Sequence, residues 1–400
     1  MATRGERVAI SGASKYFGPK AALAGLDLQV EPGSFVVLLG PSGSGKTTLL
    51  RCLAGIERLS EGTIAIGDTV VAAPGTHLPP ERRRLAMVFQ DYALWPHMTA
   101  ERNVLFPLRQ MKLPGHEARE RAHNMLARVG LAHLAGRYPN ELSGGEQQRV
   151  ALARSLVGGV GLLLFDEPLS NLDADMREQL RLAISTLARD SGATSVYITH
   201  DQSEAFSLAD RVGVLRDGRL VQWGTPEELY RQPASPFVAR FTGICTEMPV
   251  TRAGSPVGAP GAQALEVRLP GAGGAVVTAS LPRPVGDGTA LHMFVRHSAV
   301  HIVAPPDAQL MAQVRDVAFA GRGYEHALAA DGPLLFTRTF CEQRWPRGAS
   351  VGVRLNPEGC LVLPAEGPHL GGGQALAGND GGLVDLTAAM ASQLPPGPAS

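Results

Sequence analysis

The chain has 400 residues, enough for two or three domains, and its 44% hydrophobic and 18% charged residues are typical of globular proteins. Lysine plus arginine and aspartate plus glutamate number 37 each, so the formal net charge is zero. This balance gives no reason to expect a nucleic-acid partner or electrostatic attachment to a membrane surface.

The cysteines and the lengths of the apolar runs indicate in which cellular compartment the protein works. Cys52, Cys245, Cys341 and Cys360 show no Cys-x-x-Cys spacing, which argues against a structural zinc site or a disulfide framework and favours a reducing cytosol. No signal peptide follows the N-terminal residues, and no run approaches the roughly 18 apolar residues that a membrane helix needs. We therefore expect any work at a membrane to depend on a partner protein.

Three short apolar segments predict buried strands of an α/β sheet. They are residues 35–39, 161–165 and 194–198, and a helix is predicted to begin at Lys46 after the first of them. Polar residues follow each strand directly. Because the carboxyl ends of parallel strands meet at one edge of a sheet, we expect the functional site along that edge.

The loop after the first strand matches the pattern G-x-x-x-x-G-K-[ST]. Its glycines let the backbone wrap a phosphate, and its N–H groups together with the helix N-terminus supply positive potential. Lys46 is expected to reach the β- and γ-phosphates, and the Thr47 hydroxyl to coordinate Mg²⁺. A chance match would occur in about one in a hundred chains of this length, and the strand–loop–helix context argues against chance. The predicted nucleotide-binding residues of this segment are Gly40, Pro41, Ser42, Gly43, Ser44, Gly45, Lys46, Thr47 and Thr48.

An acidic pair follows the second predicted strand. Asp166 is expected to hold Mg²⁺ through water, and Glu167 to polarise the water that attacks the phosphate. Acidic residues commonly close strands, so the pair indicates catalysis only because a phosphate loop precedes it.

The segment 142–149 combines a turn with the start of a second predicted helix, near Glu146. Ser143 is expected to cap this helix, and a helix N-terminus with exposed N–H groups is a second anion site. Two phosphate-binding devices on one chain are easiest to reconcile if the second completes the nucleotide site of another copy. The residues concerned are Leu142, Ser143, Gly144, Gly145 and Glu146.

The segment 142–149 resembles the signature of ABC ATPases, and the resemblance extends from about Val8 to Gly243. It implies an α/β P-loop NTPase domain over residues 1–243, with a helical subdomain at about 91–158. It also implies ATP and Mg²⁺ as ligands, and a head-to-tail homodimer that holds two ATP molecules between the phosphate loop of one subunit and the signature of the other.

The same resemblance implies roles for four further residues. Phe17 resembles the aromatic residue that stacks on adenine, and Gln90 the glutamine that touches Mg²⁺ and the attacking water and senses the membrane partner. Asp173 belongs to a loop that links the two sites across the dimer, and His200 resembles the switch histidine that contacts the γ-phosphate. Considered alone, Phe17, Gln90 and His200 would be an ordinary core aromatic, loop residue and strand-end residue, respectively. Glu146 stands where many members carry glutamine.

Composition changes near residue 250. Residues 251–263 are rich in Gly, Ala and Pro and are predicted to form a linker or long loop. The region 244–364 is predicted to form a small all-β, OB-like barrel, and the Gly/Ala/Pro-rich tail 365–400 to be disordered. The β-like runs of the barrel are 264–269, 275–281, 292–303, 310–319, 334–340, 351–355 and 360–363.

Residues 92–99 and 230–243 resemble importer ATPases of the maltose, polyamine and ferric-iron group. In that group the C-terminal domain aids dimerisation and regulation, and the segment corresponding to 95–101 docks a helix of the membrane permease. The resemblance implies permease subunits, an extracytoplasmic substrate-binding protein acting indirectly, and a location at the cytoplasmic face of the membrane.

The transported solute does not touch this subunit, so its residues carry little information about it. Resemblance slightly favours ferric iron or a polyamine. Two alternatives are an exporter's separate ATPase subunit and an ABC ATPase that acts on nucleic acid. The β-rich C-terminal region counts against the first, and the absence of a second nucleotide domain, a coiled-coil insertion or a basic surface counts against the second.

Overall fold

The computed structural model describes residues 4–170, 172–243, 245–258, 263–271, 274–286, 288–330 and 335–365. Apart from Ala365, the predicted disordered tail lies outside the described residues. None of the helices in these ranges is long and apolar enough to cross a membrane.

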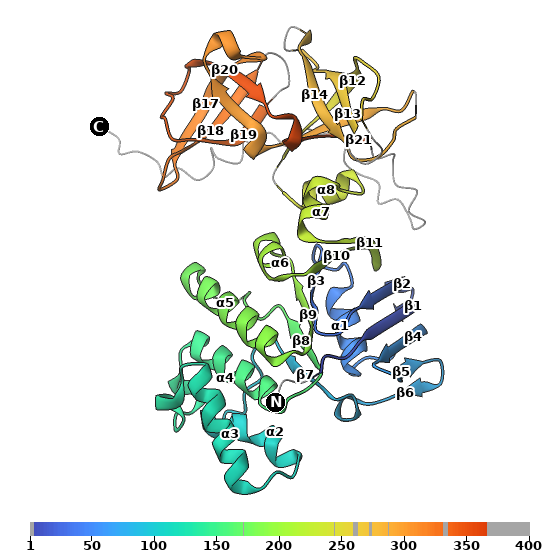
Figure 1. Ribbon diagram of the computed structural model, residues 1–400, viewed down its shortest axis with the longest axis vertical. Helices are drawn as coiled ribbons and strands as arrows, with labels where there is room; N and C mark the ends of the chain where they lie inside the picture. Colours follow the sequence, from blue (N-terminus) through green and yellow to red (C-terminus); the bar gives the residue numbers. More distant parts are fainter. Residues whose placement is uncertain are drawn as a thin grey trace, which may run out of the picture. The chain divides into compact units, whose positions relative to one another are not determined.

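An antiparallel sheet forms the N-terminal part of the chain and is drawn in blue in Figure 1. Its strand order is β2-β1-β4-β5-β6. The strands are β1 (Val8–Phe17), β2 (Lys20–Val30), β4 (Glu61–Ile66), β5 (Thr69–Ala73) and β6 (Thr76–His77).

A second, mainly parallel sheet has the order β11-β10-β3-β9-β8-β7, with only the edge strand β11 antiparallel to its neighbour. The three predicted buried strands are confirmed as the adjacent β3, β9 and β8, and every residue in them is buried. The strands are β3 (Phe35–Leu39), β7 (Leu85–Val88), β8 (Leu162–Asp166), β9 (Thr194–Thr199), β10 (Arg211–Arg216) and β11 (Arg219–Gly224).

Helix α1 (Lys46–Ala54) joins the two sheets into one core. Its Leu49, Leu50 and Leu53 pack in a cluster with Ile10 of β1 and Leu38 of β3. The first residue of α1 is therefore held in a fixed position relative to the end of β3, and this position defines the phosphate loop between them.

Helices α2, α3 and α4 lie together beyond strand β7 (Figure 1). These three helices lie within residues 100–156. The helices after α1 are α2 (Ala100–Gln110), α3 (Gly115–Arg128), α4 (Gly144–Leu156), α5 (Ala174–Ser191), α6 (Gln202–Leu208), α7 (Pro226–Arg231) and α8 (Pro236–Phe241). Short 3₁₀ turns occur at Pro80–Arg82, Ala132–Leu134 and Pro139–Glu141.

The C-terminal region confirms the predicted barrel and adds a second sheet to it. Strands β12, β13, β14, β21 and β15 form the closed barrel, and the other sheet has the order β16-β20-β17-β18-β19. The barrel strands are β12 (Cys245–Arg252), β13 (Gln263–Arg268), β14 (Val276–Leu281), β15 (Leu291–Arg296) and β21 (Cys360–Pro364). The second sheet consists of β16 (Val300–Val303), β17 (Leu310–Phe319), β18 (Tyr324–Ala330), β19 (Leu335–Cys341) and β20 (Ser350–Leu355).

Three details of this region differ from the sequence prediction. Thr251 and Arg252, assigned to a linker, pair with β13 as the end of strand β12. The predicted run 292–303 is two strands in different sheets, separated by a 3₁₀ turn at His297–Ala299. The sequence prediction lacks strand β18, because its alanines and its glutamate have low β-propensity. Its buried and less buried residues nevertheless alternate, as they do in other strands.

Arg296, at the end of β15, connects the barrel to the chain that precedes it. Only 1% of its surface is exposed. Its guanidinium donates to the carbonyl oxygens of Ala239, Gly243 and Tyr230 at 2.7–3.1 Å and to the Thr242 hydroxyl at 3.1 Å. The guanidinium also lies over the Tyr230 ring, 4.4 Å from its centroid. Five donors in one planar group suit such a set of acceptors, which lysine could not satisfy in the same geometry.

We predict that Arg296→Met lowers the free energy of unfolding by about 2–4 kcal/mol, because several buried acceptors lose their donor at once. Urea denaturation followed by circular dichroism measures the change. Arg354→Met, an exposed arginine on β20, is the control and should shift the transition little. Equal stability of the two variants would contradict the structural role of Arg296.

Candidate functional site

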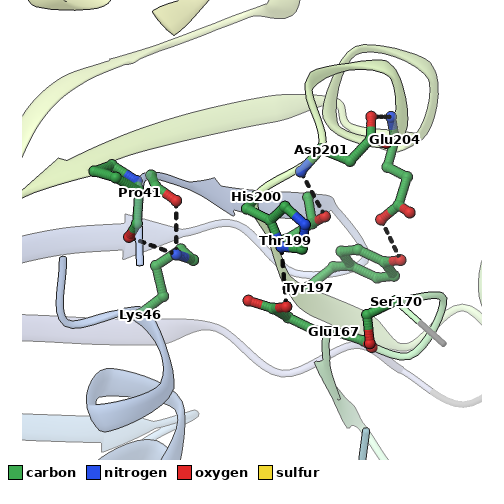
Figure 2. Close-up of polar contacts among 10 residues, drawn as sticks. Pro41, Lys46, Glu167, Ser170, Tyr197, Thr199, His200, Asp201 and Glu204 are labelled. Atoms are coloured by element: carbon green, nitrogen blue, oxygen red, sulfur yellow. Dashed lines mark hydrogen bonds and ion pairs between the residues drawn. The ribbon is translucent and has the colours of Figure 1, made fainter. Parts of the chain in front are cut away.

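The phosphate loop joins β3 to α1 in a conformation that its glycines permit. Gly43 and Gly45 have φ angles of 81° and 101°, and a Cβ at Gly45 would lie 2.4 Å from the Ala22 carbonyl oxygen. The Lys46 ammonium donates to the carbonyl oxygens of Gly40 and Pro41 at 2.7 and 3.0 Å (Figure 2). The loop thus curls around the lysine and leaves the N–H groups at the start of α1 as donors for an anion.

A cavity of about 380 Å³ opens at this loop. Phe17 stands at its edge with 49% of its surface exposed, and the Lys15 ammonium lies 4.8 Å from the centroid of its ring. The residue predicted to contact adenine is thus an exposed ring beside the phosphate loop. The cavity is lined by Phe17, Lys20, Ala22, Ser42, Gly43, Ser44, Gly45, Lys46, Thr47, Thr48 and Glu167.

Asp166 is the last residue of β8, and its side chain is buried. Burial raises the pKa of Asp166, while the nearby Arg51 and the Thr47 hydroxyl act in the opposite direction. Burial lowers the pKa of Lys46, while Glu167 and Asp166 raise it. Lys46 and Glu167 also line the same cavity.

Glu167 follows β8 with a φ of 44°, a left-handed conformation that costs a non-glycine residue about 1–3 kcal/mol. Its N–H donates to the Ile198 carbonyl at 3.2 Å, and its Oε2 lies 3.0 Å from His200 Nδ1 (Figure 2). The structure therefore brings the predicted Glu167 and His200 together. Gln90 lies exposed two residues after the end of β7, the strand that pairs with β8.

The signature residues begin helix α4. Ser143 caps the helix, and the Glu146 carboxylate accepts from both the N–H and the hydroxyl of Ser143 at 2.8 Å. These hydrogen bonds lower the pKa of Glu146. Leu142 is buried, Ser143 and Gly144 are exposed, and Gly145 packs so closely on α5 that a Cβ would lie 1.9 Å from the Met176 methyl carbon.

The lining of the phosphate cavity includes none of the residues 142–146. The sequence predicted two anion-binding devices, and within one chain they do not share this cavity. Each is formed by the N-terminus of a different helix, α1 or α4.

The family model described as "ABC transporter" matches residues 23–170. The chain is 41% identical to the Fe(3+) ions import ATP-binding protein of Rhizobium etli over 359 residues, which covers 90% of this chain and 98% of the relative. It is 45% identical to the spermidine/putrescine import ATP-binding protein of Marinobacter nauticus, over 75% of this chain and 78% of the relative. Identity to the trehalose/maltose import ATP-binding protein of Thermococcus litoralis is 49%, over 57% and 62% of the two chains.

The chain belongs to the ATP-binding subunits of ABC importers. Membership confirms the predicted fold class, and with it the ATPase activity that defines such subunits.

The ABC ATPase also contains contacts that sequence reasoning did not find. Asp173, predicted to link two subunits, caps α5 by accepting from the Met176 N–H at 2.9 Å. The buried Gln148 amide donates to the Pro168 carbonyl at 2.8 Å, so that helix α4 holds the residue next to Glu167. Gln148 lies five residues after Ser143 in a run of good helix formers, and no sequence signal distinguishes it from its neighbours.

The predicted permease-facing segment is held by two buried side chains from helices. Asn103 accepts from the Trp95 N–H and donates to the carbonyl oxygens of Trp95, Met98 and Thr99. Arg154 donates to the carbonyl oxygens of Tyr92 and Ala93 at 2.9 and 2.6 Å and lies 4.8 Å from the centroid of the Trp95 ring. In the sequence, Arg154 is visible only as a charge that interrupts an apolar run.

Proposed function

We propose that this ABC ATPase drives the uptake of a small solute or ion as a head-to-tail homodimer bound to membrane permease subunits at the cytoplasmic face. The proposal of a dimer rests on the separation of the two anion-binding helix ends. Because α1 and α4 do not share a cavity within one chain, a second copy is the simplest way to bring Ser143 to a phosphate bound at Lys46.

In the proposed complex, Phe17 stacks on adenine and residues 40–48 surround the phosphates. Thr47 and Asp166 would hold Mg²⁺ together with Gln90. The Thr47 hydroxyl lies near enough to Asp166 to lower the pKa of that carboxyl group, which supports a site that combines two hard oxygen ligands. Among the described residues no group of three or more His, Cys, Asp or Glu could hold a metal. This fits an ion whose remaining ligands are phosphate oxygens and water, and the ion would offset charge on the phosphates.

Glu167 is proposed to orient and deprotonate the attacking water, and His200 to hold Glu167 and the γ-phosphate in position. The 3.0 Å contact between the two side chains supports this pairing. Lys46 would stabilise the negative charge on the transferred phosphoryl group. Its two carbonyl acceptors hold the ammonium in place before the charge develops.

Gln90 and the segment 95–101 are proposed to connect hydrolysis to the permease. The half-buried Trp95 packs on Phe106 at 4.3 Å between ring centroids, while the neighbouring Pro96 and His97 are exposed. A rigid, partly apolar segment next to Gln90 suits the docking of a permease helix. Asp173 is proposed to link the two nucleotide sites across the dimer, in addition to capping α5.

We propose ferric iron or a polyamine as the transported solute, with a substrate-binding protein outside the membrane delivering it to the permease. The names of two relatives support this: one is an Fe(3+) ions import protein and one a spermidine/putrescine import protein. The C-terminal barrel and its companion sheet are proposed to aid dimerisation and regulation.

Coexpression with the permease and binding-protein genes encoded beside it tests the importer function. We expect a stable complex of two ATPase subunits with the permease, and ATPase activity that rises when the loaded binding protein is added. Iron-loaded and polyamine-loaded binding proteins are compared directly. Activity that responds to neither a permease nor a binding protein would exclude an importer.

We predict that Glu167→Gln retains ATP binding but slows hydrolysis by at least about 100-fold, because the amide cannot accept the proton of water. ATP should then accumulate a closed dimer, which size-exclusion chromatography detects. The exposed Glu178→Gln on α5 is the control and should behave as the unmodified protein. Undiminished hydrolysis by the Glu167 variant would exclude Glu167 as the base.

Ser143→Arg should leave each subunit able to bind ATP but prevent hydrolysis, because the bulky side chain keeps the partner's γ-phosphate away from α4. Lys46→Ala should also be inactive, through loss of phosphate binding. Mixing the two variants should restore activity, since one site of the mixed dimer then has an intact Lys46 from one chain and an intact Ser143 from the other. Failure to complement, with both variants folded, would contradict a shared site.

A further inference from the structure

Lys15 lies beside the ring that is proposed to stack on adenine. Lys15 and Phe17 are two residues apart in strand β1, the spacing that places side chains on the same face of a strand. The Lys15 ammonium lies over the Phe17 ring, 4.8 Å from its centroid. This is within the roughly 6 Å over which a cation is attracted to the face of an aromatic ring. Tyr16, between the two, is not among the residues that line the phosphate cavity.

A carboxylate fixes the ammonium group in this place. Glu57 Oε2 lies 3.1 Å from Lys15 Nζ, and the side chains of Lys15 and Glu57 are only 13% and 31% exposed. Charges that are partly shielded from water are screened less by salt than charges on the open surface. The long lysine side chain is therefore held between a carboxylate and an aromatic ring.

Backbone contacts tie the segment that carries Glu57 to strand β1. The Ser60 N–H donates to the Ser14 carbonyl oxygen at 2.9 Å, and the Ser60 hydroxyl accepts from the Tyr16 N–H at 3.1 Å. These two bonds lie on either side of Lys15 in the sequence. The backbones of both members of the ion pair are thus fixed relative to each other.

The ion pair also connects the ring to the phosphate loop through helix α1. The Glu57 N–H donates at 3.2 Å to the carbonyl oxygen of Arg51, which lies in α1. The same helix begins with Lys46 of the phosphate loop. The helix therefore sets the position of Glu57, and through it that of Lys15, relative to the place where phosphate binds.

From this geometry we propose that Lys15 is a positioning residue for adenine: Glu57 holds its ammonium against one face of the Phe17 ring, and the other face is presented to the base. The proposal rests on the proposed role of Phe17. About half of the surface of Phe17 is exposed. Without the ammonium such a ring has several rotamers available, and binding of the base then costs the entropy of ordering it.

The test compares the Kd for ADP, which carries the base, with the Kd for pyrophosphate, which occupies the phosphate loop without one. Calorimetry measures ADP directly, and pyrophosphate is measured by its competition with ADP. We expect Lys15→Met to raise the Kd for ADP about 2- to 5-fold, the range that corresponds to a cation–π contact at an exposed site. The Kd for pyrophosphate should not change. Lys15→Arg retains a cation and should restore the binding of ADP.

Two controls show whether Lys15 acts through the ring. Lys112→Met removes the same charge from an exposed residue that does not line the cavity, and it should leave both dissociation constants unchanged. In a Phe17→Ala background, Lys15→Met should change the Kd for ADP less than about 1.5-fold, because the ring on which it acts is gone. An equal effect with and without Phe17 would overturn the proposal.

Glu57→Ala separates positioning from charge by the sign of its effect. If charge alone mattered, removal of a negative charge would strengthen the binding of an anion. The proposal requires the opposite: the Kd for ADP rises, because the Lys15 ammonium loses the carboxylate that holds it. Tighter binding of ADP by Glu57→Ala would overturn the proposal. This variant also gives the answer if thermal unfolding shows that Lys15→Met does not fold.

The outcomes separate the proposal from the function on which it rests. If Phe17→Ala binds ADP as tightly as the unmodified protein, the proposed role of Phe17 fails. If Phe17→Ala binds ADP weakly while Lys15→Met and Glu57→Ala bind it normally, the positioning role of Lys15 fails alone. If Lys15→Met raises the Kd for pyrophosphate as much as that for ADP, Lys15 acts on the phosphates through its charge, and the proposal is wrong.

Discussion

Strand β9 pairs in parallel with β3 on one side and β8 on the other, and the positions of the phosphate loop, the acidic pair and His200 depend on these two ladders. Leu39 lies opposite Thr199, and Asp166 opposite Ile198, so the three strands end at nearly the same level. The phosphate loop, the acidic pair and the histidine follow those ends directly. The pairing of the strands thus brings together side chains that are more than 150 residues apart in the sequence. No contact among these side chains is needed to bring them together.

Several residues at this edge combine a structural and a proposed functional role. Ser143 and Asp173 cap helices α4 and α5 with the same oxygen atoms that are proposed to act across the dimer. Glu167 is held in a left-handed conformation between its N–H bond to β9 and its contact with His200. The buried sheet around it supplies the stability that offsets this strain. The side chains of such a site are in place before a nucleotide binds. Electrostatic stabilisation of a transition state requires side chains that are positioned in advance.

Sequence reasoning located the strands and the site because both are encoded locally. The apolar run 35–39 and the helix start at Lys46 agree with the structure to the residue, since a fully buried strand and a glycine-rich loop have compositions of their own. The buried polar partners could not be found this way. Arg154 meets Tyr92, and Arg296 meets Ala239, across more than 50 residues. Glu204 is close to Tyr197 in sequence, but only the fold shows that both side chains are buried. Long-range hydrogen bonds leave no periodicity in the sequence.

Three contacts from different parts of the proposed site are all made by residues of helix α4 or its N-cap. Ser143 caps its first turn, Gln148 in its middle holds the Pro168 carbonyl beside Glu167, and Arg154 near its end holds the segment 92–99. The helix has 13 residues and a length of about 20 Å. Its interior residues Val150, Leu152 and Ala153 are buried in the core. If the partner's nucleotide binds at its first turn, as proposed, the same helix also contacts the chain beside Glu167 and the segment 92–99. In the proposed importer, α4 is therefore the element that physically connects these three places.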